Sequence, residues 1–312
     1  MATNNLATAF WDREVDEHSH VSWMENQAVR WHINTLISGD LGVWPVEWFQ
    51  QTFASRLPFG RALSIGCGQG MLERQLVARG ICRRVDALDG SLTSLAVAKA
   101  AAAKERLRIS YFAADFNSLV LPRACYDAVF FHHSLHHVTK LERLFRELRR
   151  SMKPGAILYI DEYVGPSRLD WNDELLAPHR KIFAAISPHQ RRGDELPLPI
   201  QQDDPSEAVR SSEILPQLRI GFDTLAQRDY GGNVLSVLYP LVAPDPEVIE
   251  ELIERDASVI RAGGASYHTV LVAMPKPGLR GSLASARYWL EPKWRTLRYG
   301  LWRFLTKRDT PW

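Results

Sequence analysis

Three glycines at alternate positions are the first residues whose spacing suggests chemistry. Gly66, Gly68 and Gly70 follow the short apolar run 62–65 and precede the helical pattern 71–79. A turn that presses backbone N–H groups against a ligand leaves no room for a Cβ atom and often needs positive φ angles. The sequence therefore predicts a strand, a tight turn and a helix that together bind a nucleotide-like ligand.

Two acids extend this pattern along the chain. Asp89 ends the next apolar run, nineteen residues after Gly70, and Asp115 with Phe116 follows the run 109–113. The first carboxylate can accept both hydroxyls of a ribose, and the second can accept the exocyclic amine of an adenine. The carboxyl ends of parallel strands line the ligand crevice of an open α/β sheet. Met71 stands where the dinucleotide fingerprint G-x-G-x-x-G needs its last glycine, which disfavours a nicotinamide cofactor.

Candidates for proton transfer cluster after two later apolar runs, 128–131 and 156–160. They are His132, His133, His136 and His137, then Asp161, Glu162 and Tyr163. Histidine has a pKa suited to a base near neutrality. We predict His133 and Glu162 as the pair that contacts the acceptor, with His136 as a third catalytic candidate and a structural role as its alternative.

No metal site is expected in this region. The two histidine pairs, 132–133 and 136–137, would share one face only in a helix, and the sequence indicates no third ligand beside them. A magnesium site built on Asp161 and Glu162 is the weaker alternative.

Strand-like and helical patterns alternate from residue 61 onward, which is typical of a parallel sheet with helices on both faces. We predict a helical N-terminal layer (1–59), a cofactor-binding core (60–165), a proline-rich lid or substrate insertion (166–220), the end of the core sheet (221–275) and a basic aromatic tail (276–312). The predicted strands are 62–65, 84–88, 109–113, 128–131, 156–160, 222–230 and 268–274, and the predicted helices are 22–37, 71–79, 91–104, 140–152, 205–218 and 246–261.

The motifs Leu63–Gly70, Ala87–Asp89, Ala114–Phe116 and Tyr126–Val138 together resemble those of class I S-adenosylmethionine-dependent methyltransferases of the small-molecule type. The resemblance implies a Rossmann-like sheet of seven strands with the last strand antiparallel. It also implies S-adenosyl-L-methionine as cofactor, with its methionine part near the glycines and its ribose on Asp89. Ser64 departs from the pattern, because many members carry an acid there that orders the glycine turn. The cofactor-binding residues implied are Gly66, Cys67, Gly68, Gly70, Asp89, Gly90, Asp115, Phe116 and His132.

Segments 161–168, 204–211 and 230–232 show a looser resemblance to bacterial methyltransferases of surface-polysaccharide and glycan gene clusters. This resemblance implies O-methylation of a sugar or glycolipid by in-line displacement, with a small-molecule or lipid-linked glycan as acceptor. In a helix 205–218, the side chains of Glu207, Arg210 and Glu213 would share one face and could bind a polyol or brace each other. The substrate contacts predicted are Tyr163, Arg168, Arg210 and Tyr230.

Composition limits the other partners. Of 312 residues, 46% are hydrophobic and 24% charged, as in an ordinary globular protein. The net charge of +2 conceals a basic tail, in which nine Lys and Arg face Glu291 and Asp309. Residues 285–308 of that tail could lie on a membrane surface or pack as an ordinary helix. A nucleic-acid partner is not expected, since the basic residues lie far from the strand ends.

The three cysteines have no metal-binding spacing, and neither a signal peptide nor an apolar span is visible, so a cytoplasmic, optionally membrane-peripheral, protein is expected. Two alternatives to glycan methylation remain open. One is methylation of another small molecule, such as a polyketide or a quinone precursor. The other is a scaffold or sensor that binds S-adenosylmethionine without turnover. The oligomeric state is not predicted.

Overall fold

The computed structural model describes residues 10–12 and 22–277, and the predicted tail contact at 285–308 lies outside these residues. Its centre is a seven-stranded sheet in the order β3-β2-β1-β4-β5-β7-β6. The strands are β1 (Ala62–Ile65), β2 (Val85–Asp89), β3 (Ile109–Ala113), β4 (Tyr126–His132), β5 (Met152–Tyr163), β6 (Phe222–Asp229) and β7 (His268–Pro275).

Only β7 runs against the other strands of this sheet, pairing antiparallel with both β5 and β6. The remaining neighbours β3, β2, β1, β4 and β5 pair in parallel, so their carboxyl ends meet at one edge. The register places Tyr163 opposite His268, which brings the start of β7 to that same edge. The predicted seven-stranded, Rossmann-like sheet is confirmed.

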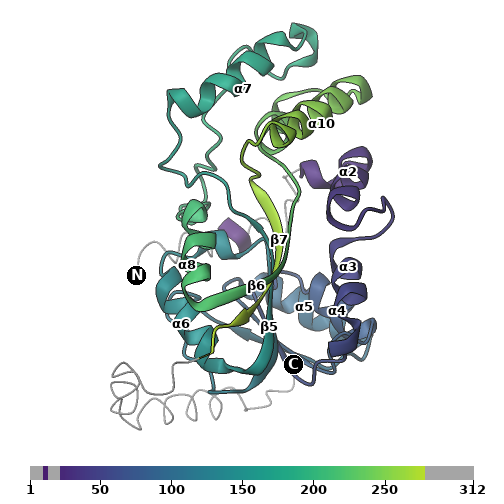
Figure 1. Cartoon of the computed structure of the whole chain (residues 1–312), viewed down its shortest axis with the longest axis vertical. Helices are drawn as coiled ribbons and strands as arrows, with labels where there is room; N and C mark the ends of the chain where they lie inside the picture. Colours follow the sequence, from purple (N-terminus) through teal and green to yellow (C-terminus); the bar gives the residue numbers. More distant parts are fainter. Residues whose placement is uncertain (1–9, 13–21, 278–312) are drawn as a thin grey trace.

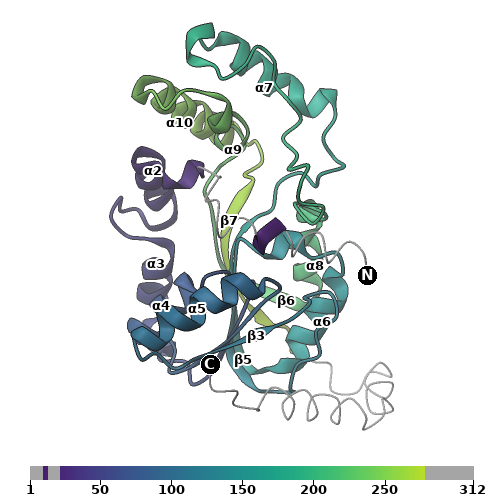
Figure 2. The same cartoon turned by 180° about the vertical axis from the view of Figure 1, so that it is seen from behind.

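Helices cover both faces of the sheet, and each face has its own apolar core (Figures 1 and 2). One core packs α4 (Met71–Ala78) and α5 (Leu92–Lys104) with the N-terminal helices against the sheet. The other packs α6 (Leu141–Ser151) and α8 (Ile214–Gly221). The apolar face of α6 is buried in this second core through Leu141, Leu144, Phe145 and Leu148.

The N-terminal layer begins with a 3-10 turn, η1 (Trp23–Glu25), and continues as α2 (Gln27–Ser38) and α3 (Pro45–Thr52). The single helix predicted over 22–37 is therefore split. Asn26 causes the break, because its side chain accepts from the N–H groups of Ala28 and Val29 and caps α2. Trp23 and Trp48 are buried, whereas Trp31 and Trp44 are largely exposed.

The insertion contains a helix that sequence patterns did not indicate, α7 (Asp173–Ala185), which lies with α10 (Pro246–Arg261) at one end of the molecule (Figure 1). The helix predicted over 205–218 is wrong for its first half. Asp204 accepts from the N–H of Ser206, a local turn that competes with helix formation, and Ala208 has a φ of 49°. Regular structure resumes only at 211.

The remaining elements are η2 (Ala54–Arg56), η3 (Leu135–His137), η4 (Pro188–Gln190), η5 (Ser211–Glu213), α9 (Leu235–Leu238) and η6 (Tyr239–Leu241).

Within the described residues, no helix combines the length and the apolar character that crossing a bilayer requires.

Candidate functional site

The glycine turn after β1 adopts backbone angles that glycine tolerates best. Gly66, Gly68 and Gly70 have φ values of 74°, 49° and 73°. A Cβ atom on Gly66 would lie 2.2 Å from the Cβ of Ser134, and one on Gly70 would lie 2.4 Å from the hydroxyl of Tyr111. Both positions therefore exclude any larger residue, as the sequence predicted.

Asp89 ties this turn to the end of β2. Its Oδ2 accepts from the N–H of Gly68 at 2.7 Å, and its Oδ1 accepts from the N–H of Ser91 at 2.8 Å. Burial raises the pKa of Asp89, and these backbone hydrogen bonds act against that rise. The adjacent Cys67 is buried, and burial raises the pKa of its thiol.

The third predicted acid lies at the same edge. Asp115 follows β3, and its Oδ1 accepts from the N–H of Asn117 at 2.9 Å. The ring of Phe116 lies 3.6 Å from the position that a Cβ on Gly66 would occupy. The structure therefore brings together the glycine turn, Asp89, Gly90, Asp115 and Phe116, which come from three separate strand ends.

A buried acid lies beneath the glycine turn although Ser64 replaces the usual one. The hydroxyl of Ser64 donates to Oε1 of Glu73, a side chain of α4 that is 1% exposed. Burial is the largest influence on this carboxyl and raises the pKa of Glu73 to about 7. Glu73 could not be selected from the sequence, because its contact with Ser64 forms only when α4 packs against β1.

Another set of side chains forms a bonded group that we call the anchor cluster. It consists of His136 and His137 of η3, Glu162 near the end of β5, and Glu207 of the insertion. The carboxylate of Glu162 is fully buried and accepts from the N–H groups of Ser134 at 2.9 Å and Leu135 at 2.6 Å. It also makes a short contact with Nδ1 of His136. Nε2 of His136 lies 3.5 Å from Glu207, which comes from the insertion.

Charges in the anchor cluster are fixed by their neighbours. Burial opposes ionisation of Glu162, but the charge and hydrogen bond of His136 outweigh it and lower the pKa of Glu162 to about 2. Burial also opposes the charge on His136, yet Glu162 and Glu207 raise the pKa of His136 well above 6.5. With their pKa values shifted in this way, Glu162 and His136 are poor general bases near pH 7. The catalytic roles predicted for Glu162 and His136, acceptor contact included, stay predictions.

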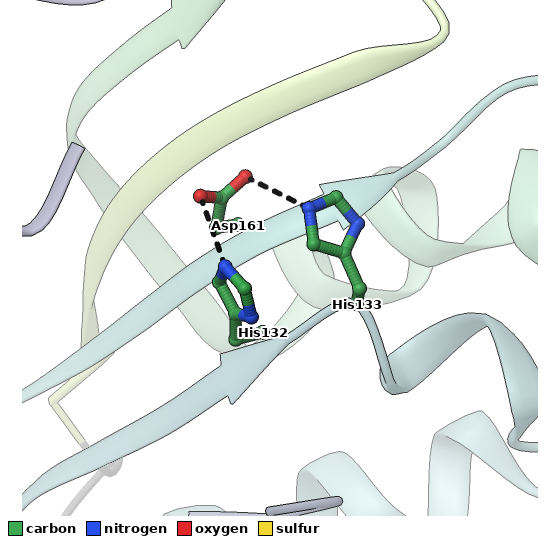
Figure 3. Close-up of side chains that lie close together, drawn as sticks. All are labelled: His132, His133 and Asp161. Carbon is green, nitrogen blue, oxygen red and sulfur yellow. Dashed lines mark ion pairs between the residues drawn. The ribbon is translucent and has the colours of Figure 1, made fainter. Parts of the chain in front are cut away.

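The second group, which we call the open cluster, consists of His132, His133 and Asp161 at the ends of β4 and β5 (Figure 3). Nε2 of His132 lies 3.8 Å from one oxygen of Asp161, and Nε2 of His133 lies 3.7 Å from the other. Tyr230 donates its hydroxyl proton to Oδ1 of Asp161 at 2.7 Å. Burial is the main cause that lowers the pKa of His133 to about 4, so the ring is neutral near pH 7 and a weak base.

An aromatic wall stands beside the open cluster. The ring of His268, at the start of β7, has its centre 5.1 Å from that of Trp23, 5.2 Å from that of Tyr163 and 5.4 Å from that of Tyr230. His268 is 4% exposed, and neither of its ring nitrogens has a hydrogen-bond partner among the described residues. His268 was not among the residues predicted for the site, because its only signal in the sequence is its position at the start of the last predicted strand.

Of the predicted substrate contacts, Tyr163 and Tyr230 lie in this wall, whereas the two arginines are committed elsewhere. Arg210 bonds to Glu142 at 2.7 Å and to Glu213 at 2.5 Å. Arg168 donates to the backbone carbonyl of Asp204 at 3.0 Å. Of the two roles predicted for the polar face, mutual bracing fits Arg210 and Glu213, whereas Glu207 contacts His136 instead.

Residues 63–160 match the family model described as "Methyltransferase domain". The match confirms the predicted enzyme class and the predicted cofactor, S-adenosylmethionine, for this part of the chain.

Two curated relatives are fungal sterol 24-C-methyltransferases. The protein of Clavispora lusitaniae is 27% identical over 189 residues, which are 58% of this chain and 45% of that protein. The protein of Schizosaccharomyces pombe is 22% identical over 245 residues, or 76% of this chain and 59% of that protein. The chain thus spans about half the length of the curated relatives it matches.

Among solved structures, the geranyl diphosphate C-methyltransferase of Streptomyces coelicolor shares the fold. It aligns with a TM-score of 0.52 and 14% identity over 88% of this chain and 97% of that one. At this identity the likeness concerns the fold alone.

Proposed function

We propose that this chain transfers the methyl group of S-adenosylmethionine to a small-molecule acceptor held beside the open cluster. The observation that carries the proposal is the shared edge. β1 pairs with β2 on one side and with β4 on the other, so the glycine turn stands between Asp89 and the histidines. Cofactor and acceptor would then meet at neighbouring strand ends.

The residues at this edge suit the cofactor. Gly66, Gly68 and Gly70 have positive φ angles and no side chains, so a ligand can approach their backbone closely. Asp89 and Asp115 lie at the same edge of the sheet, where the parallel strands end. With Cys67, Gly90, Phe116 and the backbone at His132, these residues would hold the methionine, ribose and adenine parts. The bound cofactor supplies an electrophilic methyl group, and the protein's main task is to hold the acceptor atom in line with it.

For the acceptor, we propose a mainly apolar molecule that carries one polar group. Trp23 and Tyr230 are buried and Tyr163 is partly buried around His268, whose ring nitrogens lack partners among the described residues. An acceptor that reached this wall would meet aromatic rings and one buried polar contact. The relatives named as sterol methyltransferases support an apolar acceptor.

O-methylation of a sugar or glycolipid is the second candidate. Its support is the resemblance to glycan-cluster enzymes, and it loses the polyol contacts expected from Glu207, Arg210 and Glu213, which bond to protein groups. A membrane contact through residues 285–308 would suit either a lipid-linked glycan or an apolar acceptor.

The test uses the full chain with methyl-labelled S-adenosylmethionine and two acceptor extracts, one of neutral lipids and one of glycolipids and sugars. We expect label in the neutral lipids, and Asp89→Ala should abolish it. Asp203→Ala, at an exposed position, is the matched control. Label in the sugar fraction would favour the second candidate, and binding of S-adenosylhomocysteine without transfer to either extract would favour a scaffold or sensor.

Cofactor choice is tested separately by calorimetric titration with S-adenosylhomocysteine and with NAD. We expect heat only from the first ligand. Binding of NAD alone would overturn the proposed function.

A further inference from the structure

The two rings of the open cluster converge in a way that a regular strand does not allow. Consecutive residues of a strand point to opposite faces, so His132 and His133 should diverge. His133 instead has a φ of 49°, a left-handed conformation that costs energy for any residue with a side chain. This turn brings both imidazoles to one carboxylate, that of Asp161 (Figure 3).

The distances within the open cluster are too long for hydrogen bonds. The two Nε2 atoms lie 3.8 Å and 3.7 Å from the oxygens of Asp161, beyond the limit for a direct bond. Nitrogen and oxygen atoms that ligate one ion at about 2.0–2.2 Å stand roughly 3.4 Å apart in a tetrahedral site. One ligand atom from each of the three residues lies within 4.8 Å of the other two, so the side chains would have to move closer together around an ion.

The surroundings hold Asp161 as a ligand should be held. Its side chain is 4% exposed, and Tyr230 orients the carboxylate through Oδ1. The N–H of His133 donates to the backbone carbonyl of Asp161 at 2.8 Å, which fixes β4 against β5. His132 is exposed, so an ion can enter from solvent. Second partners of this kind are usual around metal ligands.

We propose that His132, His133 and Asp161 bind a divalent transition-metal ion through two imidazole nitrogens and one carboxylate oxygen. Imidazole with carboxylate suits zinc, iron, cobalt or nickel better than magnesium. Three protein ligands leave a coordination position open, as in catalytic rather than structural sites. His133 then acts as a ligand and not as a base.

A function for the ion follows if the chain is the methyltransferase proposed above. An acceptor oxygen in the open position would be oriented beside the cofactor edge, and the ion would make its proton easier to lose. Ion binding itself does not depend on that proposal.

A second group, His136, His137 and Glu207, also has ligand atoms within 4.8 Å of one another. Nδ1 of His136 bonds to Glu162 and Nδ1 of His137 lies 3.1 Å from the hydroxyl of Ser206, while the two Nε2 atoms lie 3.5 Å and 3.8 Å from Glu207. A metal ligand must be an unprotonated imidazole, so an ion there would have to displace the proton that Glu162 and Glu207 hold on His136. This group serves as the internal control.

The experiment uses the full chain without a histidine tag, cleared of metal with a chelator and titrated with Zn²⁺ by calorimetry and with Co²⁺ by visible absorption. We expect one site, and visible Co²⁺ bands from mixed nitrogen and oxygen ligands. His132→Gln and Asp161→Asn should each weaken Zn²⁺ binding at least 100-fold, and Tyr230→Phe should weaken it by about 10–100-fold.

Two controls keep this result unambiguous. Glu207→Gln and His189→Ala, the latter at an exposed position, should leave Zn²⁺ affinity within about twofold of the parent. His132→Gln, at an exposed residue, guards against misfolding in Asp161→Asn, and S-adenosylhomocysteine titration of every variant reports an intact cofactor edge. No Zn²⁺ binding by the parent chain, unchanged binding in both His132→Gln and Asp161→Asn, or loss through Glu207→Gln would overturn the proposal.

Discussion

The two histidine–acid clusters lie within a few residues of each other, yet the protein uses them in opposite ways. In the anchor cluster, Glu162 is fully buried and bonds to two backbone N–H groups and to His136. In the open cluster, Asp161 stays 3.7 Å and 3.8 Å from its two histidines. Short hydrogen bonds join Glu162 of the anchor cluster to its neighbours, whereas Asp161 makes no direct hydrogen bond to the two histidines of the open cluster.

The difference arises on β5. Asp161 and Glu162 are consecutive residues of that strand, and consecutive side chains of a strand face opposite ways. Asp161 therefore meets Tyr230 and the ends of β4, while Glu162 reaches the turn at Ser134. Both clusters contain histidines and acids, so residue types alone do not distinguish them. The distances between these side chains, and the hydrogen bonds that they make, do.

The largest expected effect comes from Glu162→Gln. It leaves His136 with a buried charge and weakens the bonds to the N–H groups of Ser134 and Leu135, so the free energy of unfolding should fall by about 3–5 kcal/mol. Asp161→Asn keeps an acceptor for Tyr230 and should cost only about 1 kcal/mol. Urea denaturation of both variants measures the difference. Equal losses would remove the distinction between the clusters.

Acid should weaken the anchor cluster next. The folded pKa of Glu162 is about 2, below its ordinary value of 4.5. Its contribution is therefore complete above pH 4.5 and is lost as pH falls toward 2, which amounts to about 3 kcal/mol. Urea denaturation at pH 6 and pH 3 should show about 2 kcal/mol of this loss in the parent chain, with a clearly smaller pH dependence in Glu162→Gln. Parallel pH curves for the two proteins would contradict the prediction.

A third prediction concerns the link between the anchor cluster and the cofactor edge. Glu162 holds Ser134, and Ser134 packs against Gly66, where a Cβ atom would lie 2.2 Å away. Gly66→Ala should weaken S-adenosylhomocysteine binding by at least tenfold, about 1.4 kcal/mol, through this clash.

Gly80→Ala is the matched control, because Gly80 has a φ of 70° and a Cβ atom added there would meet nothing within 4 Å. It should carry the backbone penalty without the clash, and calorimetry should find normal affinity. Unchanged binding by Gly66→Ala would show that the clash is relieved at no cost.

The smallest expected effect has opposite signs for stability and activity. His268→Leu removes two buried nitrogens that lack partners among the described residues, so unfolding should become harder by about 1 kcal/mol. Methyl transfer to the acceptor should fall, because the wall loses its polar contact. Thermal unfolding and label incorporation measure the two effects, and a loss of stability would mean that His268 is structural.

The cofactor half of the molecule could be predicted closely from sequence, because each element there carries a local signal. The bounds predicted for β1 and β3 agree with the structure, and the glycines mark their own positive φ angles. Asp89 and Asp115 could be placed because strand ends meet at one edge of a parallel sheet.

The acceptor half could not be predicted in the same way, since its contacts join residues far apart in the chain. His268 reaches the wall only through the pairing of β7 with β5, and Glu207 reaches His136 only through the folded insertion. The convergence of the histidines on Asp161 depends on one unusual backbone angle, which residue types do not reveal.

The positive φ angle of His133 also lowers the stability of the folded chain. A left-handed backbone costs a residue with a side chain roughly 1–2 kcal/mol relative to the ordinary conformation, a sizeable part of the 5–15 kcal/mol that separates a typical folded domain from its unfolded chain. Glycine would relieve the strain at once but would remove the imidazole. His133 therefore keeps its imidazole at the expense of backbone stability. A search for more stable variants that selected His133→Gly would remove one of the three side chains of the open cluster.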